Sequence, residues 1–195
     1  MFLWCLKLVY LLTLGLKKGI IYKRGVRLTY NIGDKIVYPM HGAGTIVDKV
    51  DKKIMDKVRC YFIVKSPISE MVAMLPVENM ETIGIRNIIS SEEADELLDD
   101  IRQMSTDEIA NWNKRYRENL EKLKDGTIHE IAKIAKALMT RDKSLSTGER
   151  KLMINAKNAV LSELMLAKNF TLCQAEEALD ESVHCEEYLN ENQEE

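Results

Sequence analysis

The sequence predicts an α+β protein, with a small antiparallel β-barrel followed by an all-α helical domain. Between Tyr30 and Pro76, Val, Ile, Tyr and Phe are concentrated in short runs separated by Gly, Asp, Ser and Pro, which is typical of short strands joined by turns. After Ile89, patterns of Ser or Thr followed three residues later by Glu open apolar runs with helical spacing. The 195 residues, 46% of them hydrophobic, suffice for one large or two small domains and exclude a large multidomain machine.

The strand-rich part comes first and predicts four or five strands. Turn residues separate the runs at Gly33 with Asp34, at Gly42 with Gly44, along the polar run 51–57, and at Ser66 with Pro67. The runs themselves are YNIGDKIVYP, GAGTIVDKV, VRCYFIVK and MVAMLP. Short connections pair consecutive strands antiparallel, and a sheet this small hides its edges by closing, so we expect an SH3-like or Tudor-like barrel.

The helical part is predicted from its termini. Four capping boxes mark helix starts, at Ser90 with Glu93, Ser105 with Glu108, Thr127 with Glu130, and Ser146 with Glu149. Gly126 and Asn169 are placed to end the second and fourth of these helices. A fifth, acidic helix is expected over 171–188.

Apolar periodicity indicates which faces of the third and fourth helices are buried. The expected buried positions are Ile128, Ile131, Ala135 and Leu138 in the third helix, and Leu152, Met153, Ala156, Val160 and Leu164 in the fourth. Lys133 and Lys136 lie off the first stripe, and Arg150 and Lys157 share another face of the fourth helix. We therefore expect a helical domain with a basic outer surface.

These signals divide the chain into four segments: an extension over 1–28, a β domain over 29–89, a helical domain over 90–169, and an acidic tail or helix over 170–195. The apolar run 2–16 is shorter than the roughly 20 residues that a bilayer span needs. Most Lys and Arg residues of the segment come after this apolar run, whereas a signal peptide carries its positive charges before its apolar region. The segment is either an upstream extension, with translation starting near Val26 or Leu28, or a membrane-surface anchor or disordered arm.

Charge is segmented although the net charge is only −3. Residues 112–168 carry thirteen Lys and Arg against seven acids, whereas 169–195 carry nine acids and no Lys or Arg. A basic stretch flanked by acidic ones suits a polyanion such as nucleic acid, although a solvated helical surface has the same pattern. The four cysteines form no disulfide framework, which favours a reducing, cytoplasmic compartment.

Motifs for catalysis are missing, so we expect neither an enzyme nor a cofactor. There is no G-x-x-x-x-G-K-[ST] loop to cradle a nucleotide phosphate. His129 and Glu130 begin a sequence close to H-E-x-x-H, but Lys133 stands at the second ligand position and its ammonium repels a metal. The only other histidines are His41 and His184, and they give no nucleophile pair or complete metal site.

The most informative cluster spans 111–117, where Trp112 and Tyr116 are interleaved with Lys114, Arg115 and Arg117. Such a mixture suits nucleic acid, because cations neutralise phosphates and a flat ring packs on exposed bases. Alternatively Trp112 is a core residue, since it shares one helical stripe with Tyr116, Leu120 and Leu123. If Asn111 caps the helix, Trp112 occupies the first turn and can project into solvent.

Four motifs, in order and spacing from Tyr30 to Lys168, resemble the CarD/CdnL family of bacterial transcription regulators, whose N-terminal module is shared with the transcription-repair coupling factor. They are IGDKIVYPMHGAGTI, LPVENMETIGIR, NWNKRYRENLEKLKDG and LSTGERKLMINAKNAVLSEL. The coupling factor itself is excluded, because the NTP motifs of its motor are absent.

The resemblance implies a non-catalytic, monomeric regulator of initiation whose Tudor-like domain binds the RNA polymerase β subunit and whose helices bind promoter DNA largely independently of sequence. Trp112 matches a tryptophan that wedges into the minor groove at the upstream edge of the bubble and stabilises the open complex. Basic positions on the DNA backbone are matched by Lys114, Arg115, Arg117, Arg150 and Lys151. Lys52 and Met74 match polymerase contacts, where the family often carries arginine. A stand-alone protein-interaction adaptor that does not bind DNA is the alternative.

Overall fold

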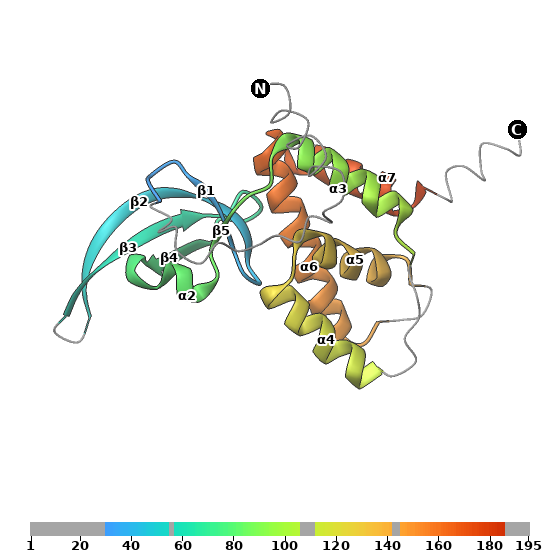
Figure 1. The fold of residues 1–195 in the computed structure, drawn as a ribbon, viewed down its shortest axis with the longest axis horizontal. Coiled ribbons are helices and arrows are strands. Elements are labelled where there is room, and N and C mark those ends of the chain that lie inside the picture. Colours follow the sequence, from blue (N-terminus) through green and yellow to red (C-terminus); the bar gives the residue numbers. More distant parts are fainter. Residues whose placement is uncertain (1–29, 55–56, 106–111, 142–144, 186–195) are drawn as a thin grey trace, which may run out of the picture.

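The computed structural model describes residues 30–54, 57–105, 112–141 and 145–185, with the backbone alone over 112–115. A curved antiparallel sheet lies beside a bundle of helices (Figure 1). The strands are β1 (Lys35–Tyr38), β2 (Gly42–Ile54), β3 (Lys57–Lys65), β4 (Val72–Pro76) and β5 (Arg86–Asn87). The helices are η1 (Val77–Asn79), α2 (Met80–Ile83), α3 (Ser91–Gln103), α4 (Trp112–Asp125), α5 (Ile128–Met139), α6 (Thr147–Lys168) and α7 (Leu172–Val183). We call residues 30–89 the β module and 90–185 the helical module.

The β module confirms the predicted sheet of short antiparallel strands followed by helices. Its five strands are ordered β4-β3-β2-β1-β5, and every pair is antiparallel. Along β3, Phe62 and Val64 are buried while Ile63 between them is half-buried, as alternation in a sheet with one core face requires. The core of the module consists of Ile36, Ile46, Phe62, Val64, Leu75, Met80 and Ile85.

The turn predicted over 51–57 is wrong for most of its length. Strand β2 continues to Ile54 and β3 begins at Lys57, with Lys52 paired to Arg59 and Lys53 to Val58. The two strands form a long hairpin that projects away from the helices (Figure 1). Both faces of its outer half are exposed, so polar residues are tolerated there and backbone pairing overrides their low strand propensity.

The helix ends agree closely with the predicted capping residues. Complete capping boxes start α3, α5 and α6 at Ser90, Thr127 and Ser146, whereas the expected start at Ser105 falls beside residues outside the described part of the chain. Helix α4 ends before Gly126, and Asn169 ends α6 in the left-handed conformation, with φ of 54°. Helix α7 has a capping box of its own at Thr171 but ends at Val183, not at residue 188.

The core of the helical module is formed mainly by α3, α5, α6 and α7. All four predicted core positions of α5 are buried, as are four of the five in α6, while Met153 is half-buried. Leu97 and Ile101 of α3 and Leu179 of α7 are fully buried against them. Helix α7 thereby belongs to the packed helical module.

One lysine contradicts the predicted basic outer surface of α5. Lys136 is only 7% exposed, and its Nζ donates to the carbonyls of Ile101 at 2.7 Å and Arg102 at 3.2 Å. These carbonyls lie in the last turn of α3, where backbone groups lack helical partners and attract a cation. Lys133, on the same helix, is exposed as predicted.

The two modules meet where the β1–β2 turn touches α6. Met40 in this turn has φ of 66° and packs against the helical core. The backbone N–H of Ala43 donates to Oγ of Ser162 at 2.7 Å. Gly42 has φ of 85°, and a Cβ added there would lie 2.5 Å from the same Oγ, so this contact requires glycine for both its conformation and its size.

We expect Gly42→Ala to destabilise the protein more than Gly33→Ala. Gly33 also has positive φ but has no atom within 4 Å of an added Cβ, so its substitution costs only the backbone strain of about 1–2 kcal/mol. At Gly42 the collision with Ser162 adds about 1–3 kcal/mol. Urea unfolding of both variants measures the difference, and equal losses would contradict the tight contact.

Candidate nucleic-acid and protein interfaces

A basic corner forms where the start of α4 meets the start of α6. The half-buried ring of Tyr116, one turn into α4, packs against the backbone of α6 at Gly148. A Cβ added to Gly148 would lie 3.3 Å from Cε2 of that ring. The contact brings Arg117, next to Tyr116, to the same corner as the first turn of α6.

Arg150 and Lys151 supply the α6 side of this corner. Both are exposed, as is Arg117, so the structure places these three predicted DNA-binding cations on the surface. The neighbouring acid Glu149 is only 5% exposed, and it forms an ion pair with Arg141 and accepts from the backbone N–H of Ser146. Because its charge is compensated within the fold, Glu149 adds little exposed negative charge beside Arg150 and Lys151.

Trp112 is the first described residue of α4. Further along the same stripe, Leu123 is 1% exposed and Leu120 packs against the helical core, so the stripe enters the core toward the end of the helix. The side chains of Trp112, Lys114 and Arg115 lie outside the described part of the structure. Their proposed contacts with DNA therefore stay predictions.

The two predicted polymerase contacts share one face of the sheet. Lys52 of β2 lies directly opposite Arg59 of β3, and Met74 of β4 lies opposite Ile63 of β3. Arg59 and Ile63 are four residues apart on one strand and point to the same side, about 13 Å from each other. Directly paired residues share a face, so Lys52 and Met74 are on that side as well, away from buried Phe62.

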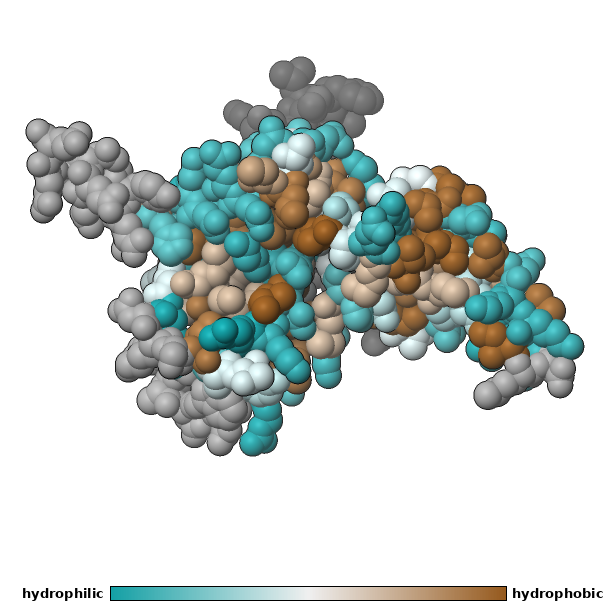
Figure 2. Space-filling view, turned by 180° about the vertical axis from the view of Figure 1, so that it is seen from behind, coloured by the Kyte–Doolittle hydropathy of each residue, from teal (hydrophilic) through white to brown (hydrophobic). Residues whose placement is uncertain are grey.

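Exposed hydrophobic side chains are concentrated on the β module. Figure 2 shows hydrophobic residues gathered over this module on the face in view. Of the nine exposed large hydrophobic residues in the described ranges, seven belong to it: Ile32, Val47, Ile54, Val58, Met71, Val72 and Met74. Strand β4, which carries Val72 and Met74, is an edge strand of the sheet. Val72 and Met74 share one face, and exposed apolar side chains beside an unpaired strand edge are typical of a protein-binding surface.

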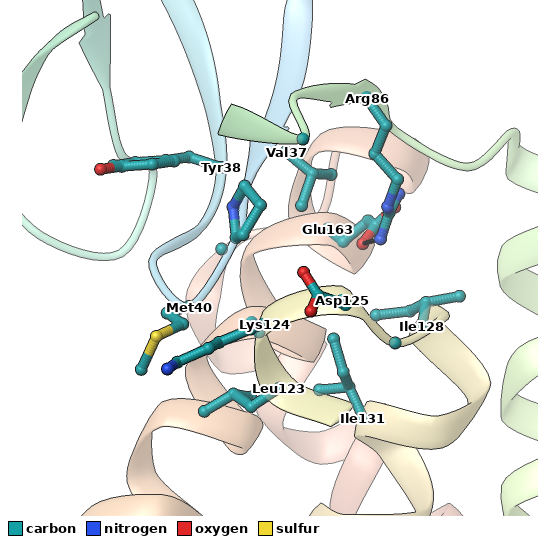
Figure 3. Close-up of a pocket in the computed structure, with 15 residues that line it drawn as sticks. Val37, Tyr38, Met40, Arg86, Leu123, Lys124, Asp125, Ile128, Ile131 and Glu163 are labelled. Atoms are coloured by element: carbon teal, nitrogen blue, oxygen red, sulfur yellow. Dashed lines mark hydrogen bonds and ion pairs between the residues drawn. The ribbon is translucent and has the colours of Figure 1, made fainter. Parts of the chain in front are cut away.

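A cleft of about 240 Å³ lies between the modules, lined by β1, the β1–β2 turn and the helices α4, α5 and α6. In Figure 3, Arg86 and Glu163 point toward each other at its upper edge. Sequence reasoning missed this pair. The sequence does contain a sign of it: Glu163 is the only charged residue between Lys157 and Lys168, and it stands in the apolar segment that forms the buried stripe of the helix.

Two side chains have displaced pKa values, and neither belongs to the candidate surfaces. Burial, followed by the hydrogen bond and charge of Asp51, raises the pKa of the Cys60 thiol. A hydrogen bond from its own backbone N–H lowers the pKa of Glu92, in the first turn of α3.

Over the described ranges there is no cluster of three or more His, Cys, Asp or Glu that could hold a metal ion. The helices described there include none with the length and apolarity to span a membrane.

Comparison with known proteins agrees with this two-module arrangement. Residues 30–89 match the CarD-like/TRCF RID domain, and residues 96–180 match the C-terminal domain of CarD. A Bacillus subtilis (strain 168) protein named "Putative transcription factor YdeB" is 32% identical over 144 residues, which cover 73% of this chain and 94% of that protein. The chain belongs to the CarD family. This confirms the resemblance found in the sequence and supports a role in the regulation of transcription.

We expect Trp112→Ala to leave the free energy of unfolding nearly unchanged, within about 0.5 kcal/mol, as is usual for an exposed position. A buried tryptophan would instead cost about 3–5 kcal/mol when truncated. Urea unfolding followed by circular dichroism distinguishes the two. A loss in the higher range would assign Trp112 to the core and remove it from the DNA surface.

Proposed function

We propose that this CarD-family protein is a non-catalytic regulator of transcription initiation that binds the RNA polymerase β subunit and holds promoter DNA at the upstream edge of the bubble. The observation that carries the proposal is the basic corner, where exposed Arg117, Arg150 and Lys151 surround the turn that begins with Trp112. These cations would bind the DNA backbone without reading sequence. Lys114 and Arg115, in the same turn, would add to this contact.

Trp112 would act as the wedge. An apolar or aromatic side chain placed in the minor groove unstacks a base step and stabilises bent or opened DNA. Trp112 is the tryptophan that the family resemblance assigns to this role, and it lies one turn before Tyr116, which contacts the start of α6. The adjoining cations would hold the phosphates on either side of the inserted ring.

The β module would dock on polymerase through the sheet face that carries Lys52 and Met74. Its match to the CarD-like/TRCF RID domain supports an interaction with RNA polymerase. Met74 is 39% exposed on edge strand β4, where a partner can contact both the side chain and the unpaired backbone. Methionine is flexible and adapts to an irregular partner surface, so it can replace arginine at this contact.

Stabilisation of the open complex follows from binding it more tightly than the closed complex. A ligand shifts an equilibrium only by its difference in affinity for the two states. Polymerase docking raises the effective concentration of the basic corner near the bubble, so the DNA contacts themselves can be weak. No bond is made or broken in this mechanism, and it requires no cofactor.

The lifetime of open complexes formed by the cognate bacterial polymerase tests the proposal. We expect the protein to lengthen this lifetime and Trp112→Ala to reduce the extension by about tenfold, equivalent to ~1.4 kcal/mol. Leu172→Ala, which truncates a 37% exposed side chain of α7, is the control and should behave as the wild type. If the wild-type protein binds polymerase but leaves the lifetime unchanged, the proposed function is wrong and the adaptor alternative is favoured.

We expect Met74→Glu to weaken binding to polymerase by about tenfold or more, because a carboxylate would be desolvated in an apolar contact. Ile154→Glu is the matched control, since Ile154 is 47% exposed on α6, far from the sheet face. Affinities of both variants can be measured by biolayer interferometry with immobilised polymerase. Equal affinities for the two variants would place the polymerase contact elsewhere.

A further inference from the structure

We infer that Glu163 is a positioning residue that locks the two modules in one relative orientation, so that the basic corner is aimed from the polymerase-docked β module. This inference rests on the proposed function, which requires both surfaces to act at once. Glu163 touches neither surface itself. It lies in the second half of α6, at the junction of the modules.

The carboxylate of Glu163 is held entirely by the segment that ends the β module. Oε1 accepts from Nη1 of Arg86 at 2.6 Å, and Oε2 accepts from Nη2 of Arg86 at 2.9 Å. Oε1 also accepts from the backbone N–H of Ile89 at 3.0 Å. A bidentate guanidinium fixes direction as well as distance, which a single hydrogen bond does not. The Glu163 side chain is 1% exposed and that of Arg86 is 24% exposed, so water screens the pair weakly.

Polar contacts beside Glu163 complete the joint. The preceding residue, Ser162, accepts from the N–H of Ala43 in the β1–β2 turn at 2.7 Å. One turn further, the carbonyl of Leu166 accepts from Nζ of Lys35 at 2.7 Å. The joint therefore joins α6 to three separate parts of the β module, which prevents rotation about any one contact.

Loss of the Glu163 charge should loosen this joint without unfolding either module. The fully buried residues of the two modules form separate hydrophobic cores, and only the half-buried Met40, Ile68 and Ile89 of the β module pack against the helical core. The guanidinium of Arg86, 24% exposed, would then be partly buried without its ionic partner, which is unfavourable. The adjacent cleft of about 240 Å³ would let water reach the guanidinium of Arg86 if the modules tilted apart.

The helix amplifies any such tilt. Arg150 and Glu163 are thirteen residues apart on the continuous helix α6, which is about 20 Å of helix axis. A tilt of about 10° at Glu163 would move the basic corner by about 3–4 Å, close to the rise of one DNA base pair. Docking would be preserved while the corner lost its alignment with the bubble edge.

Distances between nitroxide labels, measured by double electron–electron resonance, test directly whether Glu163 fixes the relative orientation of the modules. One label is placed on the exposed native Cys173 of α7 and the other on Thr82→Cys, at an exposed position of α2, with the other cysteines replaced by serine. We expect Glu163→Gln to shift or broaden the distance distribution. Asp95→Asn is the matched control, because it makes the same carboxylate-to-amide change against Lys168 of α6 within the helical module.

The functional arm uses the unlabelled full-length variants. Glu163→Gln should bind polymerase within about twofold of the wild type. Its extension of the open-complex lifetime should fall by at least about threefold, because the basic corner would sample more orientations relative to the docked β module. Adding Arg86→Gln should restore part of the extension, since the two amides can pair without a buried charge. If Glu163→Gln fails to fold, Arg86→Lys carries the same test, because lysine keeps the charge but cannot form the bidentate pair.

An unchanged distance distribution in a folded Glu163→Gln or Arg86→Lys variant would overturn the role of Glu163, even if the wild type is active. A shifted distribution with an undiminished lifetime extension would overturn it as well, since orientation would then not matter. If the wild type itself fails to lengthen the lifetime, the proposed function fails, and this outcome is distinct from both of the others.

Discussion

The arrangement of the whole molecule depends on the burial of one carboxylate, that of Glu163, between two modules. An ionised group removed from water is strongly unfavourable unless it is paired and hydrogen-bonded. Arg86 and the N–H of Ile89 meet this requirement only when the end of the β module lies against α6. The same chemistry that makes this site costly when incomplete therefore selects one orientation. A purely apolar contact of the same area would tolerate sliding.

Helix α6 serves the two modules in different ways along its length. Its first half packs by one stripe and leaves Arg150 and Lys151 exposed, whereas 159–164 is buried on every side. The lysines further along the helix are engaged with acids of α7 and α3, since Lys157 pairs with Asp180 at 3.5 Å and Lys168 with Asp95 at 2.6 Å. Of the four basic side chains of α6, Lys157 and Lys168 are thus paired with acids, while Arg150 and Lys151 supply positive charge at the α4 end of the helix.

The sequence was sufficient where local chemistry decides the structure. Capping residues such as Thr127 and Asn169 act within one helical turn, so their patterns predicted helix ends closely. Positions that respond to distant partners were missed. Lys136 is buried because the end of α3 lies over it, and Glu163 because another module covers it. The hairpin extends through 51–54 because strand pairing outweighs residue preference. Of the proposed DNA surface, the structure tests only the exposure of Arg117, Arg150 and Lys151.

Because one continuous helix, α6, carries both the basic corner and Glu163, it also limits where residues can be inserted or deleted. Each residue of an α-helix turns the chain by about 100° around the helix axis and advances it by about 1.5 Å along that axis. One residue inserted between Lys151 and Glu163 would point the basic end away from α4 or the carboxylate away from Arg86. Length variation among related chains should therefore fall in the connections, such as the one between α5 and α6, and spare this stretch of α6. Insertions or deletions within it would mark relatives whose modules are joined in a different way.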